Sequence, residues 1–250
     1  GAIGGPGTIL GLDFAGEVRR LGVSVRTGVR ADAAALADFD EVIIATGVVP
    51  RRPDIPGVEE DIVADYAQIL RGERVAGERV VILGAGGIGF DMAEFLTQEG
   101  ESLALDNERF RSAWGLTTDP LLRGGVTAPV LEPVARQVTM LQRKTSKPGA
   151  GLGPTTGWIH RTEVSRRGVR ALSGVEYVRI TRDGVDIRVD GEERSLSADT
   201  VVLCSGQESE RALADELLAA GVAVHIVGGA RLAGELDAKR AIREGMEAAA

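Results

Sequence analysis

The chain has 250 residues, of which 44% are hydrophobic and 26% are charged, and its formal net charge is −8 at pH 7. An acidic surface repels a phosphate polymer, which argues against general nucleic-acid binding. The apolar runs are too short to cross a bilayer, and the first residues show no basic region followed by an apolar core, so we expect a cytoplasmic protein without a membrane segment or secretion signal.

The first 76 residues predict the opening segment of one domain, followed by a linker. Apolar residues recur at helical spacing over residues 10–21, Val23–Val25 indicates a short strand, and Glu41–Gly47 indicates an apolar strand that ends in Thr-Gly. Residues 48–57 are rich in proline and can form neither a helix nor a central strand. We expect the chain to cross between domains here, and a helix over Val63–Leu70 to follow.

The strongest pattern in the chain is a glycine cluster of the form G-x-G-x-x-G. The β-branched run Val80–Leu83 leads into it, and apolar residues three and four apart follow it, which predicts a strand, a tight turn and a helix. In this dinucleotide-binding fingerprint, Gly84 allows a sharp turn, Gly86 lets the backbone approach a pyrophosphate, and Gly89 lets the helix pack against the strand. The helix N-terminus offers N–H groups and a positive potential to the phosphates.

Two alternatives to a dinucleotide site stay open at this point. The cluster could be a strand-to-helix turn without a ligand, or it could bind another adenosine ligand, as methyltransferases bind S-adenosylmethionine.

Basic residues follow the next predicted strand, Gln137–Gln142, which comes after an unpatterned insertion at residues 101–136. NAD-specific proteins typically carry an acidic residue after this strand, for the ribose hydroxyl. Arg143, Lys144 and Lys147 suit the 2′-phosphate of NADPH instead, and a solvated basic turn is the alternative.

In the rest of the chain, the pattern predicts a helix at residues 157–167, followed by an antiparallel meander with hairpin turns at Asp183-Gly184 and Asp190-Gly191. A second apolar strand then ends in a hydroxyl residue followed by glycine, Ser205-Gly206. The two endings, Thr46-Gly47 and Ser205-Gly206, suggest two related dinucleotide-binding domains. A strand, the pair Gly228-Gly229 and a closing helix complete the chain.

We expect the cysteine, the two histidines and Trp158 to have structural roles, although such residues often take part in catalysis or metal binding. A lone Cys204 in an apolar strand indicates a buried, unreactive thiol, and it supplies no cluster or structural zinc site by itself. The two histidines, His160 and His225, are too few for a histidine metal site, and we predict no bound metal and no catalytic side chain. For Trp158 and His160, two apart on one helix, we expect core packing for one and a surface or capping role for the other.

Together these motifs resemble the pyridine-nucleotide-disulfide oxidoreductase class, in which an NAD(P)H domain is inserted into an FAD domain. From about Gly22 to the end, the chain more narrowly resembles the C-terminal part of bacterial NADPH-dependent 2,4-dienoyl-CoA reductases. The segments that carry this resemblance are Leu141–Gly149, Gly157–Arg161, and Val227-Gly228-Gly229 followed by Glu235–Ala238.

The resemblance implies an electron chain of which this sequence holds one part. In that family a barrel carries FMN, a four-iron cluster and the substrate site, and hydride passes from NADPH to FAD before electrons reach FMN and the dienoyl thioester. This chain lacks the cysteines for the cluster, and Gly4-Gly5-Pro6-Gly7 is at best a remnant of the first FAD motif. We therefore expect FMN and the iron–sulfur cluster to be absent from this chain, and the barrel portion to be its implied partner.

The predicted fold is α/β: a Rossmann-like three-layer NAD(P)-binding domain at residues 77–206, inserted in a partial FAD/NAD(P)-binding domain formed by residues 1–76 and 207–250. The predicted function is the NADPH-binding segment of a flavin-dependent oxidoreductase that passes hydride from NADPH to FAD, with the cofactors performing the chemistry. The alternative is a noncatalytic or excised module that binds NADPH without turnover. The predicted cofactor-binding residues are Gly84, Ala85, Gly86, Gly87, Ile88, Gly89, Arg143, Lys144, Lys147, Thr46, Gly47, Ser205, Gly206, Gly228 and Gly229.

Overall fold

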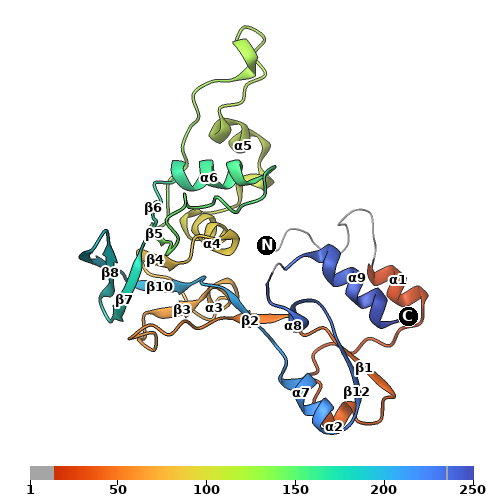
Figure 1. Ribbon diagram of the computed structural model, residues 1–250. Coiled ribbons are helices and arrows are strands. Elements are labelled where there is room, and N and C mark those ends of the chain that lie inside the picture. The colour runs from red at the N-terminus through yellow and green to blue at the C-terminus, as the bar shows by residue number, and fades with distance from the viewer. Residues whose placement is uncertain (1–13, 235) are drawn as a thin grey trace. The chain divides into compact units, whose positions relative to one another are not determined.

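The computed structural model describes residues 14–234 and 236–250, and the chain forms two compact units (Figure 1). The larger unit is Val49–Glu208, and the smaller unit combines the residues up to Val48 with Ser209–Ala250. Parallel strands with packed helices occur in both units, so the predicted α/β fold is confirmed. Gly4–Gly7 lie outside the described residues.

A five-stranded, fully parallel sheet forms the centre of the larger unit, with the strand order β3-β10-β4-β5-β6. Its strands are β3 (Val63–Asp65), β4 (Arg79–Leu83), β5 (Gln137–Leu141), β6 (Arg170–Leu172) and β10 (Thr200–Leu203). The chain runs outward from β4 through β5 to β6 and then returns to the other side of β4. The strand order therefore reverses between β4 and β10, and in such sheets ligands bind at the carboxyl ends beside this reversal.

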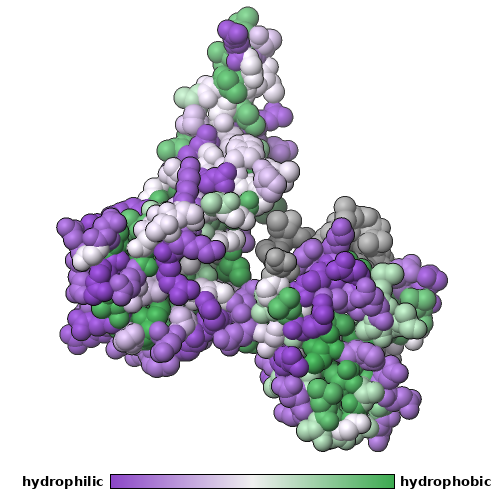
Figure 2. Space-filling model, in the orientation of Figure 1, coloured by the Kyte–Doolittle hydropathy of each residue, from purple (hydrophilic) through white to green (hydrophobic). Residues whose placement is uncertain are grey.

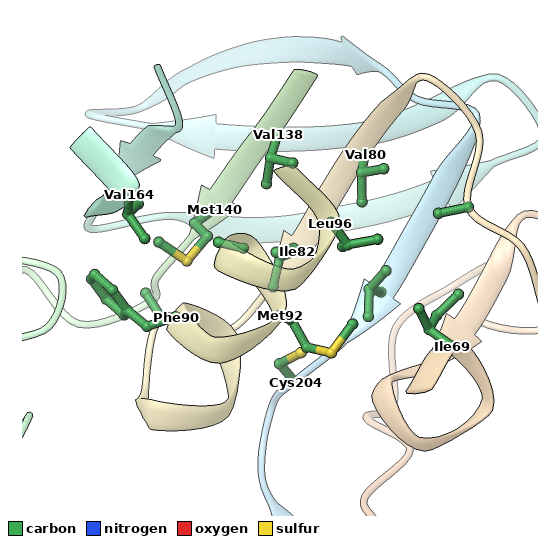
Figure 3. Close-up of a cluster of buried hydrophobic side chains, with 14 of the residues drawn as sticks. Ile69, Val80, Ile82, Phe90, Met92, Leu96, Val138, Met140, Val164 and Cys204 are labelled. Atoms are coloured by element: carbon green, nitrogen blue, oxygen red, sulfur yellow. The ribbon is translucent and has the colours of Figure 1, made fainter. Parts of the chain in front are cut away.

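Helices cover one face of this sheet. They are α3 (Tyr66–Leu70), α4 (Gly87–Thr97) and α6 (Gly157–Arg166). Figure 3 shows the resulting core, in which Ile82 and Met140 of the sheet meet Met92 and Leu96 of α4, all at most 1% exposed. The alternate residues of β4, Val81 and Leu83, point to the opposite face because successive side chains of a strand alternate.

An antiparallel meander covers that opposite face. It consists of β7 (Glu176–Thr181), β8 (Gly184–Val189) and β9 (Glu192–Ser197). Val185 and Ile187 of β8 pack against the sheet in a second core cluster. The β8–β9 turn holds Asp190 and Gly191 at positive φ, of 53° and 82°, as a tight hairpin requires. The predicted meander and its two hairpins are confirmed, although the first turn is formed by Arg182 and Asp183, and Gly184 already begins β8.

The insertion before β5 projects from the larger unit (Figure 1). It contains η1 (Leu103–Leu105), α5 (Asn107–Trp114) and η2 (Arg123–Gly125), and a single bridge between Leu116 and Val126 joins its two sides. At its base, the Trp114 ring packs edge-on against Trp158 at 6.0 Å, and the Arg166 guanidinium lies 4.9 Å from the Trp114 centroid. Apolar side chains are exposed along the projection (Figure 2), Leu121 being 89% exposed.

The smaller unit is built around two parallel strands, β1 (Glu41–Ile44) and β12 (Ala223–Ile226). Its helices are α1 (Phe14–Arg20), α2 (Ala33–Leu36), α7 (Ala212–Ala219), α8 (Gly228–Arg231) and α9 (Ala238–Ala248). Ile44 and Leu217 lie at the centre of its small core. Two short strands that lie mostly in the larger unit, β2 (Val48–Pro50) and β11 (Gln207–Ser209), pair with each other.

Two secondary-structure predictions were wrong. Val23–Val25 forms no strand, since these exposed residues pair with no strand in the described part of the chain. The helix predicted over Val63–Leu70 is a strand followed by a short helix. Asp65 ends the strand and caps α3, accepting from Gln68 N–H at 2.9 Å, while the Gln68 side chain accepts from Asp65 N–H at 3.0 Å.

No helix in the ranges 14–234 and 236–250 has the length and apolar character to span a bilayer. The same residues contain no group of three or more histidine, cysteine or acidic side chains able to hold a metal ion.

Candidate functional site

Two glycines of the fingerprint, which lies between β4 and α4, are so close to backbone carbonyl oxygens that neither tolerates a side chain. Gly84 has φ +125°, and a β-carbon there would lie 2.2 Å from the carbonyl oxygen of Cys204. A β-carbon at Gly89 would lie 2.1 Å from the carbonyl oxygen of Gly84. The first turn of the helix therefore lies directly against the end of the strand.

We predict that alanine at Gly84 or Gly89 destabilises the fold by about 2–4 kcal/mol, because a backbone carbonyl must move and, at position 84, φ is also strained. Urea unfolding followed by tryptophan fluorescence measures this, since both tryptophans lie in the larger unit. Gly87→Ala is the control, because its β-carbon meets no atom within 4 Å and alanine favours a helix. Unchanged midpoints for the first two variants would contradict the steric argument.

Gly86 differs from Gly84 and Gly89 because it faces open space. It is the N-cap of α4, with φ −86°, and a β-carbon there would meet no atom within 4 Å. In the part of the chain that the structure describes, no side chain caps this helix. The first-turn N–H groups have no intrahelical acceptors, so this helix end can bind an anion that approaches the backbone closely.

The end of β10 lies beside this helix start. Cys204 N–H donates to the Leu83 carbonyl at 2.9 Å, and a β-carbon on Gly84 would lie 3.3 Å from the backbone nitrogen of Ser205. The Ser205 hydroxyl oxygen is buried and has no hydrogen-bond partner among the described residues. The structure thus brings the predicted Ser205-Gly206 ending together with the fingerprint.

Arg51 fixes the shape of this ending and was not singled out from the sequence. Its guanidinium donates to the carbonyl oxygen of Ser205, and its backbone N–H donates to that of Gly206 at 3.0 Å. Gly206 has φ +111°, a conformation that favours glycine. No local pattern marks Arg51, because its partners lie more than 150 residues away.

The basic loop, residues 143–147, follows β5 at the same edge of the sheet. Arg143, Lys144 and Lys147 are exposed, and within the described ranges none of them forms an ion pair. Tyr177 of the meander lies nearby: its hydroxyl donates to the Leu141 carbonyl at 3.2 Å. Burial raises the pKa of Tyr177 to about 12, and the charge of Arg143 acts in the opposite direction.

A glycine turn holds the end of the basic loop near α4. Gly149 has φ +75°, and a β-carbon there would lie 2.7 Å from the ring of Phe90, in the first turns of α4. Arg161 of α6 donates to the Gly149 carbonyl at 3.0 Å. Lys147, two residues earlier, is therefore kept close to the helix that begins at the fingerprint.

In the smaller unit, the structure brings together the other two predicted pairs. Thr46-Gly47 follows β1 and Gly228-Gly229 follows β12, and a β-carbon on Gly229 would lie 3.2 Å from the Gly47 Cα. Their polar groups serve the unit itself: the Thr46 hydroxyl donates to the Glu210 carbonyl at 2.6 Å, and Gly228 N–H donates to Glu244 at 2.6 Å.

Glu244 is a buried carboxylate, 6% exposed, that accepts from three groups. The Arg231 guanidinium pairs with it, Gly228 N–H donates to it, and Arg240 Nη1 lies 3.2 Å from Oε1. Mainly through the Arg231 hydrogen bond, these donors lower the pKa of Glu244 to about 2.

We predict that this carboxylate makes the smaller unit sensitive to acid. The pKa is lower in the folded state than the ordinary value of 4.5, so the stabilisation is complete above about pH 4.5 and disappears as the pH falls towards 2. Amide hydrogen exchange of Gly228 between pH 5 and 2.5, corrected for intrinsic rates, measures the loss. Glu244→Gln should flatten the profile, and the exposed Glu247→Gln should not; a flat wild-type profile would contradict the prediction.

The two histidines and the cysteine have structural roles. His160 Nδ1 lies 2.7 Å from Glu94 Oε1 and links α6 to α4, where burial raises the pKa of Glu94. His225 Nε2 lies 3.1 Å from Glu41 Oε2 across β12 and β1. Cys204 is buried, which raises the pKa of its thiol, so the predicted burial is confirmed.

The model of the family described as pyridine nucleotide-disulphide oxidoreductase matches residues 15–232. A metal reductase from Desulforamulus reducens is 30% identical over 222 residues, which cover 85% of this chain and 32% of that protein. An NADH oxidase from Thermoanaerobacter brockii is 29% identical over 231 residues, covering 88% and 30%. This chain thus spans about a third of the length of these relatives.

Solved structures show the same fold. A complex of 2-naphthoyl-CoA reductase with 2-naphthoyl-CoA matches with a TM-score of 0.73 and 22% sequence identity, covering 94% of this chain and 31% of that one. At this identity the match concerns the fold of the shared part alone.

Proposed function

Because the chain belongs to the pyridine nucleotide-disulphide oxidoreductase family, a flavin-dependent family that binds FAD and a pyridine nucleotide, we propose that its larger unit binds NADPH. The site is the carboxyl edge of the parallel sheet, where β4 and β10 end beside the start of α4. One observation carries the proposal: the uncapped helix start at Gly86 faces open space and has room for a close ligand.

The residues present fit a dinucleotide. The pyrophosphate would lie against the backbone at Gly86, where a side chain would fill the space that the ligand needs, and the Gly87 backbone N–H, which a side chain does not remove, would donate to it. The buried Ser205 hydroxyl, just after β10, has no hydrogen-bond partner among the described residues. Arg143, Lys144 and Lys147 supply positive charge for a 2′-phosphate, which favours NADPH over NADH.

For the smaller unit we propose a role in holding FAD, with Thr46-Gly47 and Gly228-Gly229 as backbone contacts. When both are bound, NADPH supplies a hydride and FAD accepts it. The chain's own residues bind and orient the two cofactors, and none is assigned a proton-transfer role. The motifs that resemble 2,4-dienoyl-CoA reductases support a place in a similar electron chain, with an FMN- and cluster-bearing barrel as partner.

A second candidate is an NADPH-binding module without flavin or turnover. It is favoured by the smaller unit, where the Thr46 hydroxyl and Gly228 N–H already serve internal bonds. The absorption spectrum of the purified 250-residue chain separates the two candidates. A yellow preparation that releases FAD on denaturation supports the flavin-dependent function, and a colourless one that binds NADPH supports the module.

Titration calorimetry with NADPH, NADH and S-adenosylmethionine tests the nucleotide site. We expect saturable binding of NADPH, weaker binding of NADH and none of S-adenosylmethionine. The proposal fails if a folded sample binds neither nicotinamide nucleotide.

A further inference from the structure

A glutamine at the start of the basic loop holds that loop in shape. Gln142 follows β5 directly, and its Nε2 donates hydrogen bonds to the carbonyl oxygens of Lys144, at 3.0 Å, and Ser146, at 2.6 Å. One side-chain amide thus connects the start of the loop to the carbonyl oxygens of two later loop residues. A carboxylate at this position could not make either bond, because it has no N–H to donate.

Two backbone hydrogen bonds from residues 174 and 175 also hold the loop. Gly174 N–H donates to the Lys144 carbonyl at 3.0 Å, and Val175 N–H donates to the Gln142 carbonyl at 3.0 Å. The Lys144 carbonyl therefore accepts from the Gln142 amide and from the Gly174 backbone together. The loop is ordered by the protein itself, while its exposed cationic side chains form no ion pair among the described residues.

We propose that Gln142 is a positioning residue that selects NADPH over NADH by holding the basic loop ready for a 2′-phosphate. This inference rests on the proposed function. Gln142 directly follows the strand after which NAD-specific proteins place an acidic group for the ribose. Here the side chain is neutral, and its N–H groups donate to carbonyl oxygens inside the loop. Because the loop is already ordered before the nucleotide binds, it loses less conformational entropy when Arg143 and its neighbours contact the phosphate.

The test compares two variants with one matched control, all in the full 250-residue chain. Gln142→Met keeps the length of the side chain and removes its donors, and Gln142→Glu also adds a negative charge. Gln137→Glu adds the same charge at the opposite end of β5, where the side chain is exposed and, in the described structure, makes no hydrogen bond.

We expect Gln142→Met to weaken NADPH binding about tenfold and Gln142→Glu about fiftyfold, with NADH affinity changed less than about threefold. Gln137→Glu should leave both affinities unchanged. In the ligand-free chain, the amide of Gly174 should exchange at least about fivefold faster in Gln142→Met, because its acceptor is in the loosened loop. This readout needs no nucleotide.

The outcomes separate this inference from the proposed function. If the wild-type chain binds NADPH but the Gln142 variants bind it equally well, or lose NADPH and NADH affinity equally, the role of Gln142 is overturned and nucleotide binding stands. If the wild-type chain binds neither nucleotide, both proposals are overturned. A loss confined to NADPH, with faster exchange at Gly174, supports the positioning role.

Discussion

Gly86→Ala is expected to weaken NADPH binding at least about thirtyfold while leaving the stability of the fold within about 0.5 kcal/mol of the wild-type value. Within the protein, the added β-carbon meets no atom within 4 Å, and φ of −86° is ordinary for alanine. The same methyl group would occupy the space through which the backbone approaches a pyrophosphate. Calorimetric titration and thermal unfolding of the same sample measure the two effects.

Gly87→Ala provides the matched control for this prediction, since its β-carbon also meets nothing within 4 Å but lies one residue into the helix. Its effect on affinity should be clearly smaller. Full NADPH affinity in Gly86→Ala would place the pyrophosphate elsewhere, and a large loss of stability would show that the site is not open in solution.

Arg143→Ala is expected to weaken NADPH binding about 10- to 100-fold and NADH binding less than about threefold, because a hydrogen bond to a charged group contributes about 1.5–3 kcal/mol. NADH lacks the 2′-phosphate, so it does not depend on this charge. The difference between the nucleotides should shrink as salt concentration rises, since screening weakens exposed charge pairs. Titrations of both nucleotides at low and high salt measure it.

Arg182→Ala is the control for a nonspecific charge effect. Arg182 is 85% exposed on the β7–β8 turn, and its removal changes the net charge by the same amount. Both nucleotides should bind this variant as they bind the wild type. Equal losses of NADPH and NADH affinity in Arg143→Ala would contradict the assignment of Arg143 to the 2′-phosphate.

Local patterns predicted the larger unit well where neighbouring residues decide the structure. The β-branched run before Gly84 and the spacing of Met92 and Leu96 define a strand and a helix that pack on each other. The pairs Asp183-Gly184 and Asp190-Gly191 indicated the meander because few residues other than glycine adopt the positive φ that Gly184 and Gly191 have here.

Predictions were wrong or incomplete where contacts with residues distant in the sequence determine the local structure. Val63–Asp65 is a strand because it pairs with β10, far along the chain, and the Asp65–Gln68 capping box was the local signal that a helix begins only afterwards. Val23–Val25 had the composition of a strand, but the described residues offer it no partner. Similarly, the Gln142 side-chain amide donates hydrogen bonds within the basic loop, and the only signal for this in the sequence is its position directly after β5.

The position of β3 has a practical consequence for anyone who shortens this protein. A fragment beginning at residue 77, just ahead of the fingerprint, would lack β3 and leave the outer backbone groups of β10 without partners. Bare strands of this kind recruit other chains and aggregate. A fragment meant to crystallise or to be studied by NMR should therefore start at Val49, so that Val63 and its neighbours shield the sheet.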